Sequence, residues 1–102
     1  MAYEYQITDV AQEEIDKAIN YIINNLSNQK AASNLLNELE KKLINICEFP
    51  MSYPDCSYYY IQDKNIRHAI INNYVLVFKI CDKKIIVLRF KHSKQNIINL
   101  EK

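Results

Sequence analysis

Apolar residues return every three or four positions in two stretches of the first half of the chain. Residues 10–26 and the stretch from 32 to 46 each show this spacing, with charged residues between the apolar ones. Each pattern predicts a helix with one buried face, and Pro50 is expected to close the second helix. Because only the polar break LSNQ at 26–29 separates them, we expect an antiparallel helical hairpin.

The rest of the chain alternates with the period of two that is typical of strands. The opening YEYQIT at 3–8 predicts a short strand, after which Thr8 or Asp9 should cap the first helix. Beyond Pro50 the segments IRHAII, YVLVFKI and KIIVLRF predict three strands joined by turns, and YYYI at 58–61 is a further candidate strand. The sequence therefore predicts an α+β fold: a short N-terminal strand and a helical hairpin packed on an antiparallel sheet of three to four further strands.

The strand pattern gives this sheet two unlike faces if Asn72 and Asn73 form the first turn. We expect one apolar face, which the helical hairpin covers: Leu76, Phe78, Ile80, Ile86, Leu88 and Phe90. We expect the second face to be mixed in character: His68, Val75, Val77, Lys79, Val87, Arg89 and Lys91.

Composition narrows the class of protein. With 102 residues, 49% of them apolar, the chain is expected to form one domain over residues 1–102. No apolar run is long enough to cross a membrane and the first residues do not resemble a signal peptide, so we expect a cytoplasmic protein. The formal net charge is only +1, so affinity for an anion must come from a local patch.

Glycine and cysteine usage limits the chemistry. The chain has no glycine, which excludes phosphate-cradling loops and requires turns with positive φ to use Asn or Asp, as at Asn72 and Asp82. The cysteines Cys47, Cys56 and Cys81 lack the paired spacing of zinc sites, and we interpret them as buried or half-buried thiols. We expect neither a metal nor a cofactor.

Positive charge gathers where the last strand ends. Arg89, Lys91, His92 and Lys94 form this basic strand end, which is either a solvated end or a patch that faces an anionic partner. His92 shares parity with Phe90, so it either closes the edge of the core or acts as an acid or base.

Two residues of the preceding strand allow a similar choice. His68 is either a surface imidazole or a catalytic one. Arg67 should face the helices, and we predict a structural role in which a carboxylate or backbone carbonyls accept from its guanidinium.

The order of these segments resembles the RelE/ParE superfamily of bacterial toxins from type II toxin–antitoxin modules. The resemblance lies in YQIT-x-x-A-x-x-E-I, AASNLLNELEKKLINICEFP, and IRHAIINNYVLVFKI followed by KIIVLRFKH. Its most specific part is the spacing of Arg67, Asn73, Tyr74 and Phe78. RelE-like members are ribosome-dependent ribonucleases, whereas ParE-like members poison DNA gyrase through protein contact.

Two departures favour the ParE-like side, on which the protein is not expected to be an enzyme. Val75 follows Tyr74 where the ribonucleases typically carry Arg, and residues 95–102 contain neither Tyr nor His. The resemblance then implies a growth-arresting toxin, and we predict from the basic strand end that its target contacts are Arg89, Lys91 and Lys94. The alternatives are an mRNA endonuclease with an atypical site and a degenerate relic that only binds its antitoxin. If the protein is a nuclease, the catalytic residues are His68, His92 and Lys94.

The resemblance also implies a partner. Antitoxins of this superfamily resemble acidic, partly disordered chains that fold along their toxins, so a toxin–antitoxin hetero-oligomer is expected. An extended segment could add to a sheet edge while an amphipathic helix lies beside the hairpin.

Overall fold

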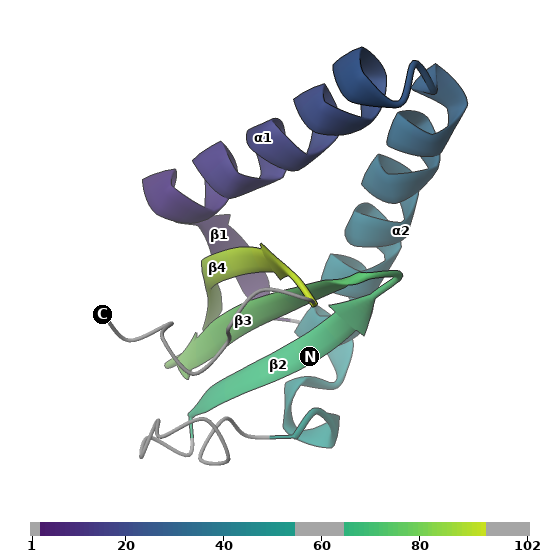
Figure 1. Ribbon diagram of the computed structural model, residues 1–102. Helices are drawn as coiled ribbons and strands as arrows, with labels where there is room; N and C mark the ends of the chain where they lie inside the picture. The colour runs from purple at the N-terminus through teal and green to yellow at the C-terminus, as the bar shows by residue number, and fades with distance from the viewer. Residues whose placement is uncertain (1–2, 55–64, 94–102) are drawn as a thin grey trace.

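The computed structural model describes residues 3–54 and 65–93 and confirms the predicted α+β fold (Figure 1). Along the chain, two helices follow the first strand and precede the remaining three, as predicted. The elements are β1 (Glu4–Ile7), α1 (Asp9–Asn25), α2 (Gln29–Glu48), the short 3-10 helix η1 (Pro50–Ser52), β2 (Ile66–Ile71), β3 (Tyr74–Cys81) and β4 (Lys84–His92). The candidate strand at 58–61 and Cys56 lie outside the described residues.

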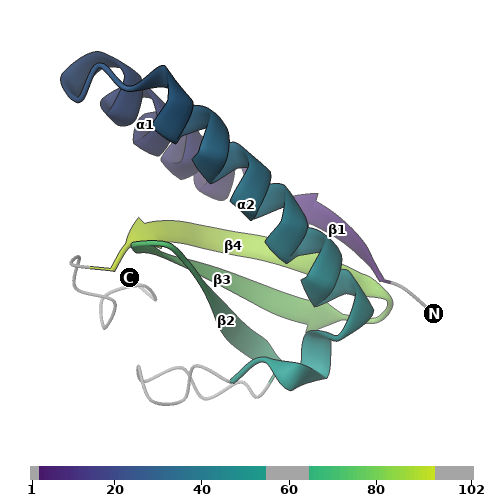
Figure 2. The ribbon, with the colours of Figure 1, turned by 90° about the vertical axis from the view of Figure 1, so that its right-hand side faces the viewer.

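The four strands form one mixed sheet in the order β1-β4-β3-β2. β2, β3 and β4 are the predicted antiparallel meander, and β1 pairs in parallel with the first half of β4, from Glu4 opposite Lys84 to Ile7 opposite Val87. Both helices lie on the same side of this sheet (Figure 2). α1 packs mainly over β4, whereas α2 contacts β1, β2 and β4.

The turns use the residues that a chain without glycine can offer. Asn72 and Asp82 have φ angles of 53° and 57°, as predicted for the two hairpin turns, and Ser27 between the helices has a φ of 49°. Thr8 caps α1, because its hydroxyl oxygen accepts from the Ala11 N–H. The same hydroxyl donates to the Val87 carbonyl at 2.9 Å, which fixes the start of α1 to β4.

The core lies between the helices and the sheet. Its largest fully buried side chains are Ile46, Leu76, Phe78, Ile85 and Val87. Cys47 also belongs to this core, and burial raises the pKa of its thiol. Cys81 is exposed, contrary to the expectation of a buried or half-buried thiol, because it ends β3 beside the turn.

The predicted apolar face of β4 was wrong for its first half. Ile85 and Val87, not Ile86 and Leu88, face the core, since Val87 stands opposite Phe78. A register shift then inserts Leu88 as an extra residue, so that Phe90 again faces the core, as predicted. One extra residue exchanges the two faces of a strand, and alternation alone does not locate it.

Arg67 has the structural role that the sequence predicted. One terminal nitrogen of its guanidinium donates to the Tyr53 and Met51 carbonyl oxygens, at 2.5 and 3.4 Å. Phe78, opposite Arg67 in β3, packs edge-on against the Tyr53 ring. These contacts hold the segment after η1 against the start of β2.

Candidate partner-binding groove and basic strand end

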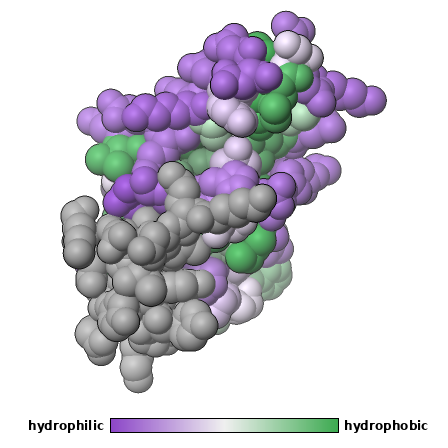
Figure 3. Space-filling view, viewed as in Figure 1, coloured by the Kyte–Doolittle hydropathy of each residue, from purple (hydrophilic) through white to green (hydrophobic). Residues whose placement is uncertain are grey.

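A groove of about 760 Å³ lies between α1, the start of α2, the β2–β3 turn and the end of β4. Apolar and charged side chains both line it: Glu14, Lys17, Ala18, Tyr21, Ile22, Leu26, Ala31, Leu35, Asn72, Asn73, Tyr74, Phe90, Lys91 and His92. Figure 3 shows apolar side chains among hydrophilic ones near the helical hairpin. A groove with apolar and charged walls suits an amphipathic segment better than a small polar ligand.

Aromatic rings line the sheet side of this groove. Tyr74 stacks on Phe90 with the ring centres 4.8 Å apart, and His92 meets Tyr74 edge-on at 5.2 Å. Burial, together with the neighbouring Tyr21 phenol, raises the pKa of Tyr74. This side of the groove is therefore preformed by ring packing, and the Tyr74 hydroxyl stays neutral at physiological pH.

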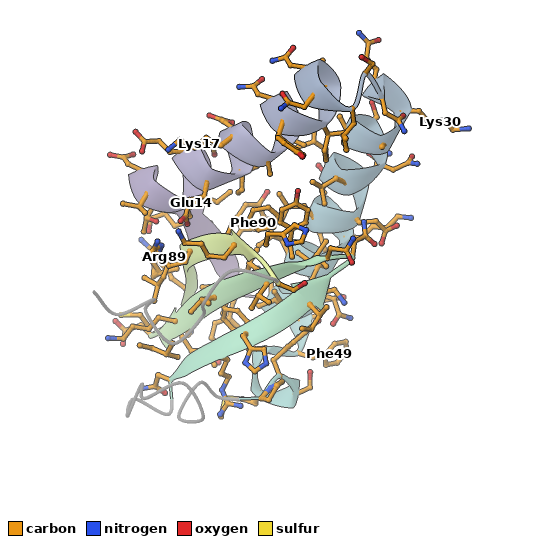
Figure 4. All side chains as sticks on the ribbon, viewed as in Figure 1. Glu14, Lys17, Lys30, Phe49, Arg89 and Phe90 are labelled. Carbon is orange, nitrogen blue, oxygen red and sulfur yellow. The ribbon has the colours of Figure 1, made fainter. Side chains whose placement is uncertain are left out.

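One carboxylate, Glu14 of α1, organises the basic strand end (Figure 4). Two nitrogens of Arg89 donate to it: Nε to both oxygens, at 3.1 and 3.2 Å, and a terminal nitrogen to Oε2 at 2.9 Å. Lys91 Nζ lies 2.8 Å from the same carboxylate, and the Phe90 backbone N–H donates to it at 2.8 Å. Glu14 thus ties α1 to three consecutive residues of β4.

The balance of forces on Glu14 favours its charged form. Burial alone would raise its pKa, but the hydrogen bonds from Arg89, Lys91 and the Phe90 N–H outweigh burial and lower the pKa. The Glu14 side chain is 13% exposed, against 22% for Arg89 and 26% for Lys91. The group is shielded enough for these contacts to exceed the small contribution of a surface ion pair.

Comparison with known proteins identifies the family. A model of the ParE toxin of the type II toxin–antitoxin system parDE matches residues 5–97. The chain belongs to the ParE toxin family. No curated protein matches it in a sequence search.

Solved structures share the fold of this ParE family toxin. A chain of the chromosomal ParDE system from P. aeruginosa superposes with a TM-score of 0.72 at 12% identity, covering 91% of this chain and 98% of that one. A mutant of the toxin RelE from E. coli in the free state gives 0.64 at 17% identity, covering 96% and 90%. A chain of the toxin–antitoxin complex RelBE2 from Mycobacterium tuberculosis gives 0.56 at 16% identity, covering 90% and 99%. At these identities the likeness concerns the fold alone.

The toxin brings some of the sequence-predicted residues together and separates others. Arg89 and Lys91 meet at Glu14, so each already has an anionic partner. His68 stands opposite Val77, and His92 opposite Tyr74, three residues away along β3, which puts the two imidazoles on opposite faces of the sheet. Lys94 lies outside the described residues.

Glu14 is the site residue that the sequence analysis did not single out. It is one of the charged residues that lie between the apolar ones in the first predicted helix. Its spacing contained a signal, since Glu14 lies three residues after the buried Ala11 and four before Ala18, at the border of the buried stripe. A charged residue at such a border requires a partner from the sheet, but spacing along one helix does not name that partner.

Over residues 3–54 and 65–93, no three His, Cys, Asp or Glu side chains are grouped so that they could hold a metal ion. Within the same ranges, neither helix is long and apolar enough to cross a membrane.

Proposed function

We propose that this ParE family toxin arrests growth by binding an essential cytoplasmic protein, with DNA gyrase as the candidate target, and that a cognate antitoxin neutralises it. The observation that carries this choice is the placement of the candidate catalytic groups. His68 and His92 lie on opposite faces of the sheet, and Arg89 and Lys91 share one carboxylate. A ribonuclease needs an acid, a base and cations around one phosphate, which this placement does not favour.

The basic strand end is the proposed target contact. Lys91 and Arg89 are about a quarter exposed while paired with Glu14, and Lys94 follows them in the chain. Lys91 also lines the groove. Charges at the rim of an interface act mainly on association rate and specificity, so neutralising them should weaken target engagement and its salt dependence.

The groove supports the antitoxin half of the proposal. Its apolar wall from Ile22, Leu26 and Leu35 fits the apolar face of an amphipathic helix, and Lys17 and Lys91 fit acidic residues beside that face. At the β2 edge of the sheet, one backbone group is already hydrogen-bonded within the chain, because the His68 N–H donates to the Pro54 carbonyl. We therefore expect the antitoxin helix to make the main contact, with any added strand contributing less.

Induction of the toxin without its antitoxin tests the proposal. We expect growth arrest with loss of negative supercoiling in a reporter plasmid, while transcripts on translating ribosomes stay whole. Cleaved transcripts with normal supercoiling would point instead to the RelE-like alternative. Continued growth despite soluble expression would identify a relic that keeps only antitoxin binding.

Hydrogen exchange tests the antitoxin contact. The probe is the protein encoded by the open reading frame adjacent to that of the toxin. We expect it to form a tight complex that protects α1 and α2 along the groove, with a Kd that rises with salt. Binding that leaves both helices unprotected would overturn the groove as the contact.

A further inference from the structure

The outer edge of β4 changes its neighbour halfway along. Up to Val87 it pairs with β1, and the Thr8 N–H donates to the Val87 carbonyl as the last backbone bond of that pair. The chain then turns into α1, while β4 runs on to His92. After the extra residue Leu88, the Phe90 N–H points to the Glu14 carboxylate. Glu14 therefore occupies the position of a strand carbonyl at this edge.

Among the described residues that line the groove or contact Glu14, cations outnumber carboxylates. One carboxylate serves the cations of Arg89 and Lys91 as well as a backbone N–H. Lys17 lines the same groove, and no described residue pairs with it. A shielded site with more cations than anions attracts a further carboxylate.

We propose that Glu14 is an internal competitor of the antitoxin: its carboxylate holds the position at Arg89 and Lys91 that an acidic antitoxin side chain takes in the complex. This inference rests on the proposed function, in which an acidic partner enters the groove. Binding is then an exchange, in which the incoming carboxylate takes over Arg89 and Lys91 and Glu14 turns towards Lys17 or water. The exchange needs no cation to become buried and unpaired at any stage.

The exchange also provides specificity. A neutral segment in the groove must leave the contacts of Glu14 intact and gains nothing from Arg89 or Lys91. An acidic segment replaces those contacts with equivalent ones and adds its apolar burial against the exposed Tyr21 and Leu26. The toxin therefore selects an acidic helix over other amphipathic helices. Only a helix with a carboxylate can replace Glu14 at Arg89 and Lys91.

The test compares Glu14→Gln with Glu13→Gln in binding to the protein of the adjacent open reading frame. Both variants remove one negative charge from the same turn of α1, but Glu13 is exposed and forms no ion pair with a described residue of β4. In Glu14→Gln the new amide oxygen can still accept from the Phe90 N–H, so the fold is kept while the competing charge is lost. We expect the Kd to fall about three- to tenfold for Glu14→Gln, with a steeper salt dependence, and to change less for Glu13→Gln.

A second variant keeps the inference testable if Glu14→Gln does not fold. Lys91→Gln removes a cation that the incoming carboxylate would take over, so we expect the Kd to rise about threefold or more. Unchanged or weaker binding by folded Glu14→Gln, or unchanged binding by Lys91→Gln, overturns the inference while leaving the proposed function in place. Failure of the wild-type toxin to bind overturns both.

Discussion

The two halves of β4 satisfy the same outer edge in different ways. From Lys84 to Val87 the neighbour is β1, whose backbone pairs with the strand in parallel. Among the described residues, side chains take over from Leu88 to His92: Glu14 accepts from the Phe90 N–H and pairs with Arg89 and Lys91, and the Thr8 hydroxyl lies 3.4 Å from the Leu88 carbonyl oxygen. The first half faces a closed core, whereas the second half lines the groove.

This difference separates the part of the strand that holds the fold from the part that can change partners. In the first half, backbone pairing with β1 and the burial of Ile85 and Val87 in the core are contacts within the folded chain. A carboxylate that bridges α1 and β4 can be exchanged for another carboxylate without unpairing the sheet. A partner site is therefore expected beside Glu14 and not beside β1.

The largest effect should come from the first half. Ile85→Ala is expected to lower the free energy of unfolding by about 2–5 kcal/mol, because Ile85 is completely buried between the sheet and the helices. Urea unfolding monitored by circular dichroism measures this loss. The matched control is Ile86→Ala, the same change one residue along, on a half-buried side chain of the second face. Equal losses of unfolding free energy for the two variants would contradict the observation that Ile85, and not Ile86, faces the core.

These two isoleucines also mark the limit of prediction from sequence. Helical spacing located α1 and α2 within about three residues at their ends, and alternation located β2, β3 and β4. Alternation did not reveal the extra residue Leu88, because KIIVLRF is apolar at consecutive positions and fits either phase. The packing of Val87 against Phe78 and the helices decides the phase, and that packing is tertiary.

The second effect concerns the carboxylate itself. Glu14→Ala should lower the free energy of unfolding by about 1–3 kcal/mol, because it leaves Arg89, Lys91 and the Phe90 N–H without their shared acceptor. Glu13→Ala, on the exposed side of the same helix, should change it by less than about 0.5 kcal/mol. A loss at Glu14 no larger than that at Glu13 would mean that the bridge contributes nothing to the fold.

The candidate site was harder to predict than the fold for the same reason. The sequence placed Arg89 and Lys91 at the end of the last strand, and it assigned Arg67 a structural role. It could not show that Glu14, 75 residues earlier than Arg89, faces them, because that contact depends on how α1 crosses β4. Long-range pairs of this kind follow from the docking of elements, which no local pattern records.

A smaller effect on stability should appear at low pH. Hydrogen bonds lower the pKa of Glu14 in the folded toxin, so its contribution is present above the unfolded value of about 4.3 and is lost as the pH falls through the lower folded pKa. We expect the stability difference between wild type and Glu14→Gln to narrow between about pH 6 and about pH 3. Urea unfolding across this range measures the narrowing, and Glu13→Gln corrects for the loss of one negative charge. A difference that stays constant would contradict a lowered Glu14 pKa.

The smallest effect on toxicity is expected from removing the two imidazoles. This test distinguishes a ParE-like toxin from a RelE-like ribonuclease most directly. His68→Ala and His92→Ala, singly and together, should leave growth arrest unchanged, because side chains on opposite faces of the sheet cannot act on one phosphate. The His92 change removes an edge-on contact with Tyr74, so a loss of about 0.5–1.5 kcal/mol in stability is expected and soluble expression must be verified. Growth assays with transcript mapping provide the measurement. If a soluble single variant no longer arrests growth, and transcripts cut by the wild type stay whole, that imidazole performs chemistry on RNA. A loss in His92→Ala would then make the second half of β4 a catalytic edge, whereas a loss in His68→Ala would place the chemistry at β2.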